Sequence, residues 1–265
     1  MRRAVLLLLL AALTGCAPKP KVLRVCADPN NLPFSNDKGE GFENKLAEMV
    51  ARDLGEKVEY TWWAQRRGFV RNTVKEGRCD VWPGVASSLE MLATTRPYYR
   101  STYVFVTRAD RNLDIRSYDD PRLKTATVGV QLVGDDGMNT PPAHALTRRG
   151  IIGNVRGYMV YGDYSHPNPQ AEVINAVDRG DIDVAVVWGP LAGYFASKAV
   201  HPMRITPVQP WLDGPSLPMV FDISMGVRKD DVKLRDRLDR VLEKREPDIR
   251  TLLASYHVPL VQPAA

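Results

Sequence analysis

The sequence predicts an α/β protein with two similar lobes, each built on a mostly parallel sheet. Segments typical of strands and of helices alternate along the chain, as they do in βαβ units. In addition, residues 72–81 recur at residues 175–184, with Asn, Val, Gly, Asp and Val in the same places. Each copy predicts a helix that ends at a glycine, then a turn and an apolar strand. Chance is the alternative explanation for the repeat, because helix–glycine–strand transitions are common.

The first part of the chain predicts a strand, a helix and a second strand in succession. Residues 23–27 form a short apolar run, and turn formers fill the loop at residues 28–36. Apolar residues from Phe42 to Leu54 fall on one face of a helix that Gly55 ends. Alternation over residues 58–62 indicates a half-buried strand, after which the first repeat copy begins.

The second lobe is expected after a strand at residues 103–106 that crosses between the lobes. Its own first strand follows at residues 128–130, and residues 139–146 predict a helix with Asn or Thr as cap and Pro in the first turn. The second repeat copy supplies the next helix and a strand at residues 182–187. Two such lobes leave a cleft at the carboxyl ends of their strands.

The end of the chain follows a Pro-rich stretch at residues 206–218. A strand is expected at residues 223–227. The last helix shows four apolar residues on one face: Leu234, Leu238, Val241 and Leu242. Pro247 ends this helix, and a closing helical turn follows it.

The N-terminus predicts an export signal that ends in a lipid-modified cysteine. Arg2 and Arg3 precede an apolar run at residues 4–13 that is too short to span a bilayer permanently. Leu13-Thr14-Gly15-Cys16 looks like a bacterial lipobox, in which removal of residues 1–15 leaves a lipid on Cys16. Ordinary cleavage and an uncleaved anchor are the alternatives. Residues 16–21 would then tether a periplasmic domain that meets the membrane only through the lipid.

The charge does not favour a nucleic-acid partner. The formal net charge of +5 falls to about +3 without the two arginines of the export signal. No zinc, basic–aromatic or Gly-rich phosphate motif is present in the sequence. Five basic residues partly share a helix face by their spacing: Arg66, Arg67, Arg71, Lys75 and Arg78. Such a face is usually solvated, and the alternative is that it docks an acidic partner.

The cysteines predict one disulfide bond. If Cys16 carries lipid, Cys26 and Cys79 remain, and each lies beside a predicted strand. Neighbouring parallel strands would bring the two close together in an oxidising compartment. Two buried free thiols are the alternative. A catalytic or metal-binding role is not favoured, because there is no CxxC motif and no histidine near either cysteine in the sequence.

Several motifs resemble bacterial periplasmic solute-binding proteins of the polar amino-acid class, family 3. They lie at residues 23–28, 33–34, 41–43, 128–131 and 226–231. Further segments resemble the MxaJ/XoxJ-like subgroup, which accompanies pyrroloquinoline-quinone (PQQ) methanol dehydrogenases. These segments are residues 28–36, 65–69, 134–137, 139–146, 160–164 and 187–194. The resemblance covers residues 22–258 and depends on the motifs occurring together and in order.

The resemblance implies the bilobal, type II periplasmic-binding-protein fold with two hinge segments. Lobe one would comprise residues 22–106 and 207–262, and lobe two residues 108–206. The two repeat copies would then occupy equivalent places, one in each lobe.

Two departures from the family pattern argue against a free amino acid as ligand. Receptors of this class grip the ligand carboxylate with an arginine that follows a Ser-x-Thr-like turn. Here residues 86–93 contain no arginine, and Arg96 belongs to a Pro-Tyr turn away from that clamp. The aspartate that holds the ligand ammonium is replaced by Trp188-Gly189.

Loops that follow strands face the cleft in this fold, and they supply the candidate ligand or partner residues. In lobe one these are Asp28, Asn30, Phe34, Gln65, Arg66 and Gly84. In lobe two they are Gln131, Asp135, Asp136, Thr140, Tyr161, Asp163 and Trp188. The helix start at Thr140 offers N–H groups for an anion. The alternatives are structural: Phe34 as packing, Asp28 as a turn cap and Trp188 as core.

No metal, cofactor or catalytic residue is expected. Several acidic residues and histidines could suggest a metal site: Asp135, Asp136, His144, Asp163 and His166. Their spacing matches neither an EF-hand loop nor a zinc motif. Adjacent aspartates in a Gly-rich loop more often form a solvated turn. No nucleophile–base pair stands out either.

Three functions follow from this reading. The first is a periplasmic accessory protein that binds a methanol dehydrogenase, its cytochrome c or its maturation proteins, with a small ligand or a peptide in the cleft. The second is the substrate-binding receptor of an ABC importer for a small solute. The third, least favoured, is a dehydratase-like enzyme, for which Asp28, His144 or Asp163 would have to act as acid or base.

Overall fold

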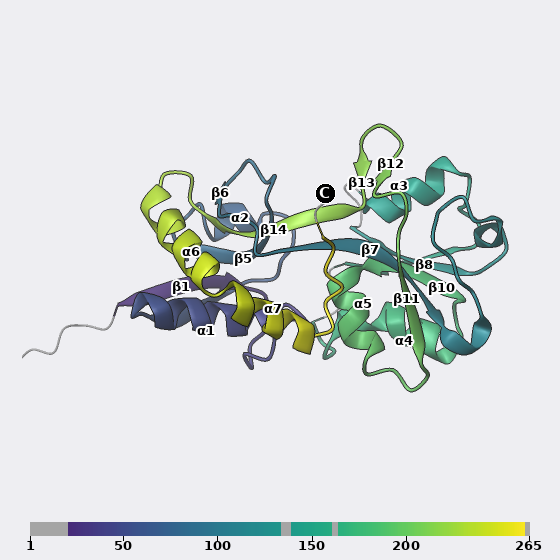
Figure 1. Cartoon of the computed structure of the whole chain (residues 1–265), viewed down its shortest axis with the longest axis horizontal. Coiled ribbons are helices and arrows are strands. Elements are labelled where there is room, and N and C mark those ends of the chain that lie inside the picture. The colour runs from purple at the N-terminus through teal and green to yellow at the C-terminus, as the bar shows by residue number, and fades with distance from the viewer. Residues whose placement is uncertain (1–20, 134–138, 161–163, 263–265) are drawn as a thin grey trace, which may run out of the picture.

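The computed structural model describes residues 21–133, 139–160 and 164–262, which form two lobes side by side (Figure 1). Helices α1 (Phe42–Leu54), α6 (Val232–Lys244) and α7 (Glu246–Ser255) belong to one lobe. Helices α3 (Pro141–Arg148), α4 (Glu172–Arg179) and α5 (Gly189–Ala196) belong to the other. This is the two-lobed α/β architecture that the alternating pattern predicts.

The sheet of lobe one has three parallel strands and one antiparallel strand. Their order is β4 (Lys57–Trp62), β1 (Val22–Ala27), β5 (Val81–Ala86) and the antiparallel β14 (Val220–Val227). The short β6 (Ala93–Thr94) pairs with β14. The apolar face of α1 packs on this sheet and against α6 and α7. The expected strands and the helix ending at Gly55 are therefore confirmed in this lobe.

The first repeat copy does not form the expected continuous helix. Helix α2 covers only Phe69–Asn72, and a non-helical turn follows to Gly77. The hydroxyl of Thr73 donates to the carbonyl of Phe69 at 2.6 Å, which offers the backbone an alternative to the helical pattern. Val74 is completely buried, so the turn is pulled into the core. Because the helix is so short, the basic residues from Arg66 to Arg78 do not share one helix face.

The sheet of lobe two repeats the same plan. Its order is β7 (Tyr99–Arg108), β10 (Val184–Trp188), β8 (Val128–Leu132) and β9 (Val155–Met159), with β8 parallel to both neighbours. The antiparallel β11 (Met203–Pro207) pairs with β7. Here the repeat copy behaves as expected: α4 ends at Gly180, whose φ of 80° suits glycine, and β10 follows. Strands β9 and β11 and helix α5 are additions that the sequence pattern did not predict.

The small elements complete the chain. Two short hairpins pair β2 (Asn30–Asn31) with β3 (Ser35–Asn36) and β12 (Leu212–Asp213) with β13 (Leu217–Pro218). Three 3₁₀ turns lie at η1 (Ala109–Arg111), η2 (Pro121–Lys124) and η3 (Pro169–Ala171). Helix α7 is longer than the closing turn expected after Pro247.

Strand β7 crosses between the lobes, as residues 103–106 predict. Residues 99–102 pair with β14, whereas residues 103–108 pair with β10 and β11. The chain returns to lobe one between β11 and β14. The lobe boundaries at residues 106–108 and 206–207 stay a prediction, since one strand takes part in both sheets.

The segment after α7 adds contacts between the lobes. It runs back across β7 (Figure 1), where Ser101 donates its hydroxyl hydrogen to the carbonyl of Pro259 at 2.7 Å. On α5, a Cβ at Gly193 would lie 1.9 Å from the carbonyl oxygen of His257. Only glycine allows this approach, which holds the C-terminal segment against lobe two.

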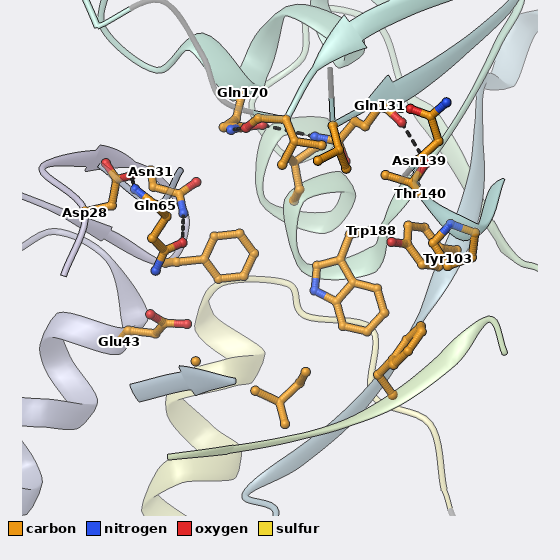
Figure 2. A pocket seen from close by; sticks show the side chains of 18 of the residues that line it. Asp28, Asn31, Glu43, Gln65, Tyr103, Gln131, Asn139, Thr140, Gln170 and Trp188 are labelled. Carbon is orange, nitrogen blue, oxygen red and sulfur yellow. Dashed lines mark hydrogen bonds between the residues drawn. The ribbon is translucent and has the colours of Figure 1, made fainter. Parts of the chain in front are cut away.

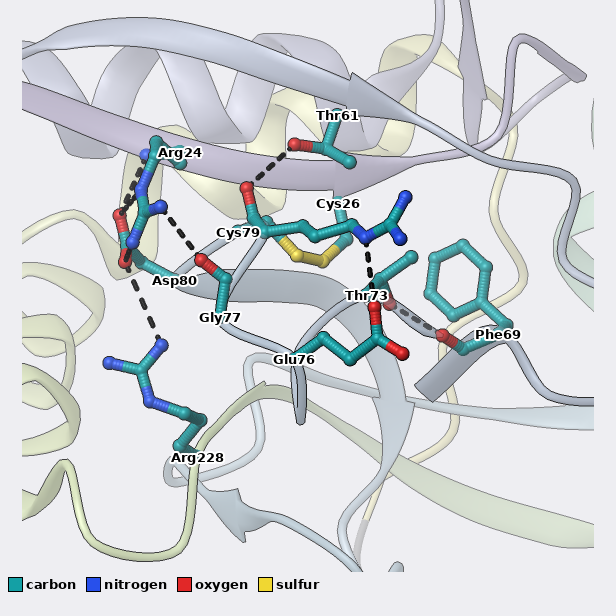
Figure 3. Close-up of a disulfide and its surroundings, with 11 residues drawn as sticks. Arg24, Cys26, Thr61, Phe69, Thr73, Glu76, Gly77, Cys79, Asp80 and Arg228 are labelled. Carbon is teal, nitrogen blue, oxygen red and sulfur yellow. Dashed lines mark hydrogen bonds and ion pairs between the residues drawn. A yellow bond between two sulfur atoms is a disulfide. The ribbon is translucent and has the colours of Figure 1, made fainter. Parts of the chain in front are cut away.

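The predicted disulfide is confirmed between Cys26 and Cys79 (Figure 3). Both residues are completely buried, and their Cα atoms are 5.5 Å apart. Beside the bond, the guanidinium of Arg24 donates to both carboxylate oxygens of Asp80, at 3.1 and 2.5 Å. The bridge therefore joins β1 to the residues that lead into β5.

Candidate functional site

A cavity of about 440 Å³ lies between the lobes, with walls from both (Figure 2). Seven of the residues that the sequence nominates line it: Asp28, Phe34, Gln65, Gly84, Gln131, Thr140 and Trp188. Four others, Asp135, Asp136, Tyr161 and Asp163, lie outside the described residues, as does Cys16. Asp28, Gln65 and Trp188 lie at or just after the ends of β1, β4 and β10, as expected for a cleft at the carboxyl ends of strands. The prediction was wrong for Gly84 and Gln131, which lie inside β5 and β8 and not in loops after them.

Asn30 and Arg66 do not line the cavity, but they close it from the side. The amide of Asn30 donates to the carbonyl of His166 at 2.8 Å, and its oxygen accepts from the N–H of Asn168 at 3.2 Å. The guanidinium of Arg66 lies 4.9 Å from the ring centroid of Tyr164, within cation–π range. Both residues therefore link lobe one to the segment between β9 and α4.

The carboxylate of Asp28 ties three segments together. It is 1 % exposed and accepts from the N–H of Asn30 at 2.9 Å and from the N–H of Gln65 at 2.7 Å. It also accepts from the phenol of Tyr164 in lobe two. Asp28 therefore both caps its turn and lines the cavity, and these donors occupy most of its acceptor capacity.

Replacing Tyr164 with phenylalanine should shift the protein toward a more open arrangement of the lobes. The change removes the phenol hydroxyl and with it the interlobe hydrogen bond to Asp28, and a bond to a charged group contributes about 1.5–3 kcal/mol. A difference of that size changes an open–closed equilibrium by about tenfold or more. Small-angle X-ray scattering should report a larger radius of gyration. Tyr158→Phe on β9, outside the cavity, is the control; identical scattering from both variants would contradict the expectation.

In lobe two, three polar residues hold one another at the cavity wall. The amide of Gln131 donates to Gln170 at 3.0 Å, and the hydroxyl of Thr140 donates to the carbonyl of Gln131 at 2.7 Å. Thr140 occupies the cap position of α3, but its hydroxyl makes no capping bond. Pro141 and Pro142 follow and have no N–H, so this helix start offers fewer donors to an anion than the sequence suggests.

Aromatic side chains form most of the apolar wall. The ring of Trp188 lies 5.3 Å from that of Tyr103 and 5.9 Å from that of Phe221, edge to face in both pairs. Phe34 and Tyr99 add a second aromatic surface from lobe one. Trp188 is half-buried, so it serves as part of the core and as part of the cavity wall at once.

Glu43 also lines the cavity, although the sequence did not nominate it as a site residue. It is 4 % exposed and lines the cavity from the first turn of α1. Burial raises the pKa of its carboxyl to about 8, and the negative charge of Asp28 adds to the rise. Gly84 lies opposite, where a Cβ would be 1.9 Å from Oε1 of Glu43. An acidic residue at a helix start normally suggests a solvated partner of the helix dipole.

The cavity holds no positive charge among the residues the structure describes. Its described lining contains two acidic residues and no lysine, arginine or histidine. Arg96 is turned away: its guanidinium pairs with Glu243 at 3.2 Å, and its N–H donates to Asp239. The described lining therefore agrees with the sequence, which places no arginine where the clamp is expected.

Other lining residues come from elements where the sequence carried no signal for the site. They include Asn31, Tyr99, Tyr103, Tyr164, Gln170 and Phe221. In strands, such residues look like ordinary half-buried positions. Among the described residues, no group of three or more His, Cys, Asp or Glu side chains is placed to hold a metal ion.

Two α/β lobes around a polar and aromatic cavity define a two-lobed binding protein. The chain belongs to the bacterial extracellular solute-binding proteins, family 3, whose model matches residues 23–257. It is 34% identical over 262 residues to Protein MoxJ of Methylorubrum extorquens strain AM1, covering 94% of this chain and 85% of that protein.

Solved structures agree with this assignment and confirm the type II fold. The periplasmic binding protein XoxJ from Methylobacterium extorquens AM1 matches with a TM-score of 0.75 and 40% identity, over 91% of this chain and 100% of that one. MxaJ from Methlophaga aminisulfidivorans MPT matches with a TM-score of 0.76 and 27% identity, over 90% and 100%. Within the described part of the chain, no helix has the length and apolar character needed to cross a bilayer.

Proposed function

We propose that this protein is a periplasmic accessory factor of a PQQ-dependent methanol dehydrogenase system, which binds the dehydrogenase, its cytochrome c or a maturation protein. Similarity to MoxJ, XoxJ and MxaJ over most of the chain supports the association with methanol oxidation. The main observation against a free amino acid as ligand is the composition of the cavity lining. Its described residues include no basic side chain to hold a carboxylate.

Exposed basic side chains on the segment that follows Gln65 support a protein partner. Gln65 lines the cavity, and the exposed residues that follow it include Arg71 and Lys75. Exposed charges steer the encounter with an oppositely charged partner. An acidic face on the partner would therefore be attracted to this segment of lobe one.

The experiment is capture of partners from periplasmic extract of methanol-grown cells, followed by binding measurements with the purified dehydrogenase and cytochrome c. We expect recovery of one of them. The double variant Arg71→Glu/Lys75→Glu should weaken that binding by about tenfold or more, because reversed charges repel an acidic face. Lys233→Glu/Arg240→Glu on α6 is the control with the same change in net charge. No recovery of dehydrogenase, cytochrome or maturation protein would count against the proposal.

A second candidate is a receptor that delivers a small solute to an ABC importer. The size of the cavity favours it, because 440 Å³ lies within the range of small-molecule sites. A solute that raises the melting temperature in a thermal-shift screen would support this reading, since ligand binding stabilises the folded state. An enzymatic role has less support: the described lining holds no histidine, cysteine, serine or lysine, and the carboxylate of Asp28 is engaged by three donors.

We further propose export through residues 1–15 and a lipid anchor on Cys16, which residues 16–21 would join to the folded part. The lipobox-like sequence supports this. Lobe one would comprise residues 22–106 and 207–262, and lobe two residues 108–206. Mass spectrometry of the mature N-terminus tests the anchor, and a diacylglyceryl mass on Cys16 is the expected result.

A further inference from the structure

Glu43 presents a buried carboxyl to the cavity, and no described residue hydrogen-bonds to it. Its side chain points from α1 toward the space between the lobes (Figure 2). It is 4 % exposed, and no hydrogen bond or ion pair to its carboxyl occurs within the described residues. Burying a carboxyl without a partner is costly, so a group that stays in such a place is suited to meet a ligand.

The described groups around Glu43 supply no positive charge. Asp28 faces it from the loop after β1, Tyr60 from β4, and Tyr98 and Tyr99 from the start of β7. Burial raises the pKa values of the three phenols, so they are neutral near pH 7. Within the described part of the chain, the other charge near the carboxyl is the negative charge of Asp28.

The opposite wall of the cavity consists of aromatic rings. Trp188, Tyr103 and Phe221 pack edge to face, with ring centroids 5.3 to 6.3 Å apart. The faces of such rings attract cations, most strongly for tryptophan, and ammonium ligands are recognised in this way. An anionic ligand would find no basic side chain in the described lining and few N–H donors at the start of α3.

We propose that the cavity binds an organic ammonium group, with Glu43 as counter-ion and Trp188, Tyr103 and Phe221 as the aromatic wall. The ammonium belongs either to a free amine or to a lysine side chain of a partner protein. This inference deepens the proposed function, since it names the chemistry that enters the cleft. It differs from amino-acid recognition because nothing in the described lining holds a carboxylate.

Binding should depend on pH with a defined sign. Burial raises the pKa of Glu43 to about 8, so the carboxyl is mostly protonated in the empty cavity at pH 7. An ammonium ligand needs the ionised form and releases that proton. Its affinity should rise by up to about tenfold per pH unit below pH 8 and level off above it. A neutral ligand that accepts a hydrogen bond from the protonated acid would show the opposite trend.

Calorimetry with the full folded protein between pH 6 and 9 tests the proposal. The probes are choline, its uncharged isostere 3,3-dimethylbutan-1-ol, and Nα-acetyl-lysine methylamide. We expect both ammonium probes to bind more tightly than the isostere by about tenfold or more, with affinity rising with pH. Tighter binding of choline indicates a free amine, and tighter binding of the blocked lysine indicates a partner side chain. Equal binding of the isostere, falling affinity with pH, or no ammonium binding at millimolar concentration would overturn it.

Glu43→Gln keeps the size of the side chain and removes its charge. The variant should lose about tenfold or more in ammonium affinity, together with the pH dependence. Glu48→Gln is the control on the same helix, where Glu48 is half-buried and pairs with Lys45 at 3.8 Å. Glu43→Asp should restore the pH dependence if glutamine disturbs folding. If Glu43→Gln binds the ammonium probes as tightly as the wild type, this inference is refuted, even where capture of the dehydrogenase succeeds. If capture fails while ammonium binding is intact, only the proposed function is refuted.

Discussion

Replacing Glu43 with glutamine should stabilise the protein at pH 9 by up to about 4–5 kcal/mol and change its stability little at pH 4. The pKa of Glu43 is raised to about 8 in the folded protein from an ordinary value of 4.5. Burial is the main cause, followed by the negative charge of Asp28. Glutamine occupies the same space without a proton to lose.

The sign follows from proton binding. Between pH 4.5 and about 8 the folded protein holds the Glu43 proton and the unfolded chain releases it. Stability from this group is therefore fully present below pH 4.5, falls as the pH rises, and is lost above about pH 8. Other groups titrate as well, so the informative quantity is the difference between the variant and the wild type.

Urea unfolding of both proteins at intervals from pH 4 to pH 9 measures that difference. We expect the free energy of unfolding of the variant to exceed that of the wild type by an amount that grows with pH and levels off above pH 8. Glu48→Gln should follow the wild-type curve more closely, because the side chain of Glu48 is only half-buried and pairs with Lys45 on the same helix. Parallel curves for Glu43→Gln and the wild type would show that the carboxyl has an ordinary pKa.

Removing the disulfide with Cys26→Ala/Cys79→Ala should lower the free energy of unfolding by about 4 kcal/mol. The bond joins residues 53 positions apart, and closing a loop of that length costs the unfolded chain about this much entropy. Both sulfur atoms also lie in a buried cluster with Phe69, Val70 and Val74, so alanine leaves small cavities that add to the loss.

Urea unfolding with and without dithiothreitol separates the bond from the packing. Reductant should lower the stability of the wild type toward that of the double variant and leave the variant unchanged. The slope of free energy against urea should rise in the variant, because an uncrosslinked chain exposes more surface. A wild-type midpoint that is unaffected by full reduction would contradict the entropic argument.

Much of the fold was predictable because local patterns and tertiary packing agree. In α1, the apolar spacing from Phe42 onward matches the face that the structure buries. In the second repeat copy, Gly180 ends α4 and β10 begins soon after, as the pattern requires. The prediction of a continuous helix in the first repeat copy was wrong. The chain leaves the helix at Thr73, where the side chain bonds to the carbonyl of Phe69 and Val74 turns into the core.

The candidate site was predictable only in part. Residues at the ends of strands, such as Asp28 after β1 and Trp188 at the end of β10, could be nominated because strand ends converge in this type of fold. The closing contact of Asn30 with His166 joins residues 136 positions apart and has no signal in the sequence. Glu43 was missed because an acid at a helix start looks like a solvated residue.

The sequence by itself determined the alternation of elements, the repeat that gives two lobes, the cysteine pair and the lack of an arginine clamp. Each of these depends on residue type and spacing along the chain. The tertiary structure alone decided the state of Glu43, because Asp28, Gly84 and the aromatic residues come together only when strands from both lobes converge. The pKa of a buried carboxyl depends on the groups that surround it in space. Neither this pKa nor the role of the carboxyl in binding can therefore be predicted from the residues next to it in the sequence.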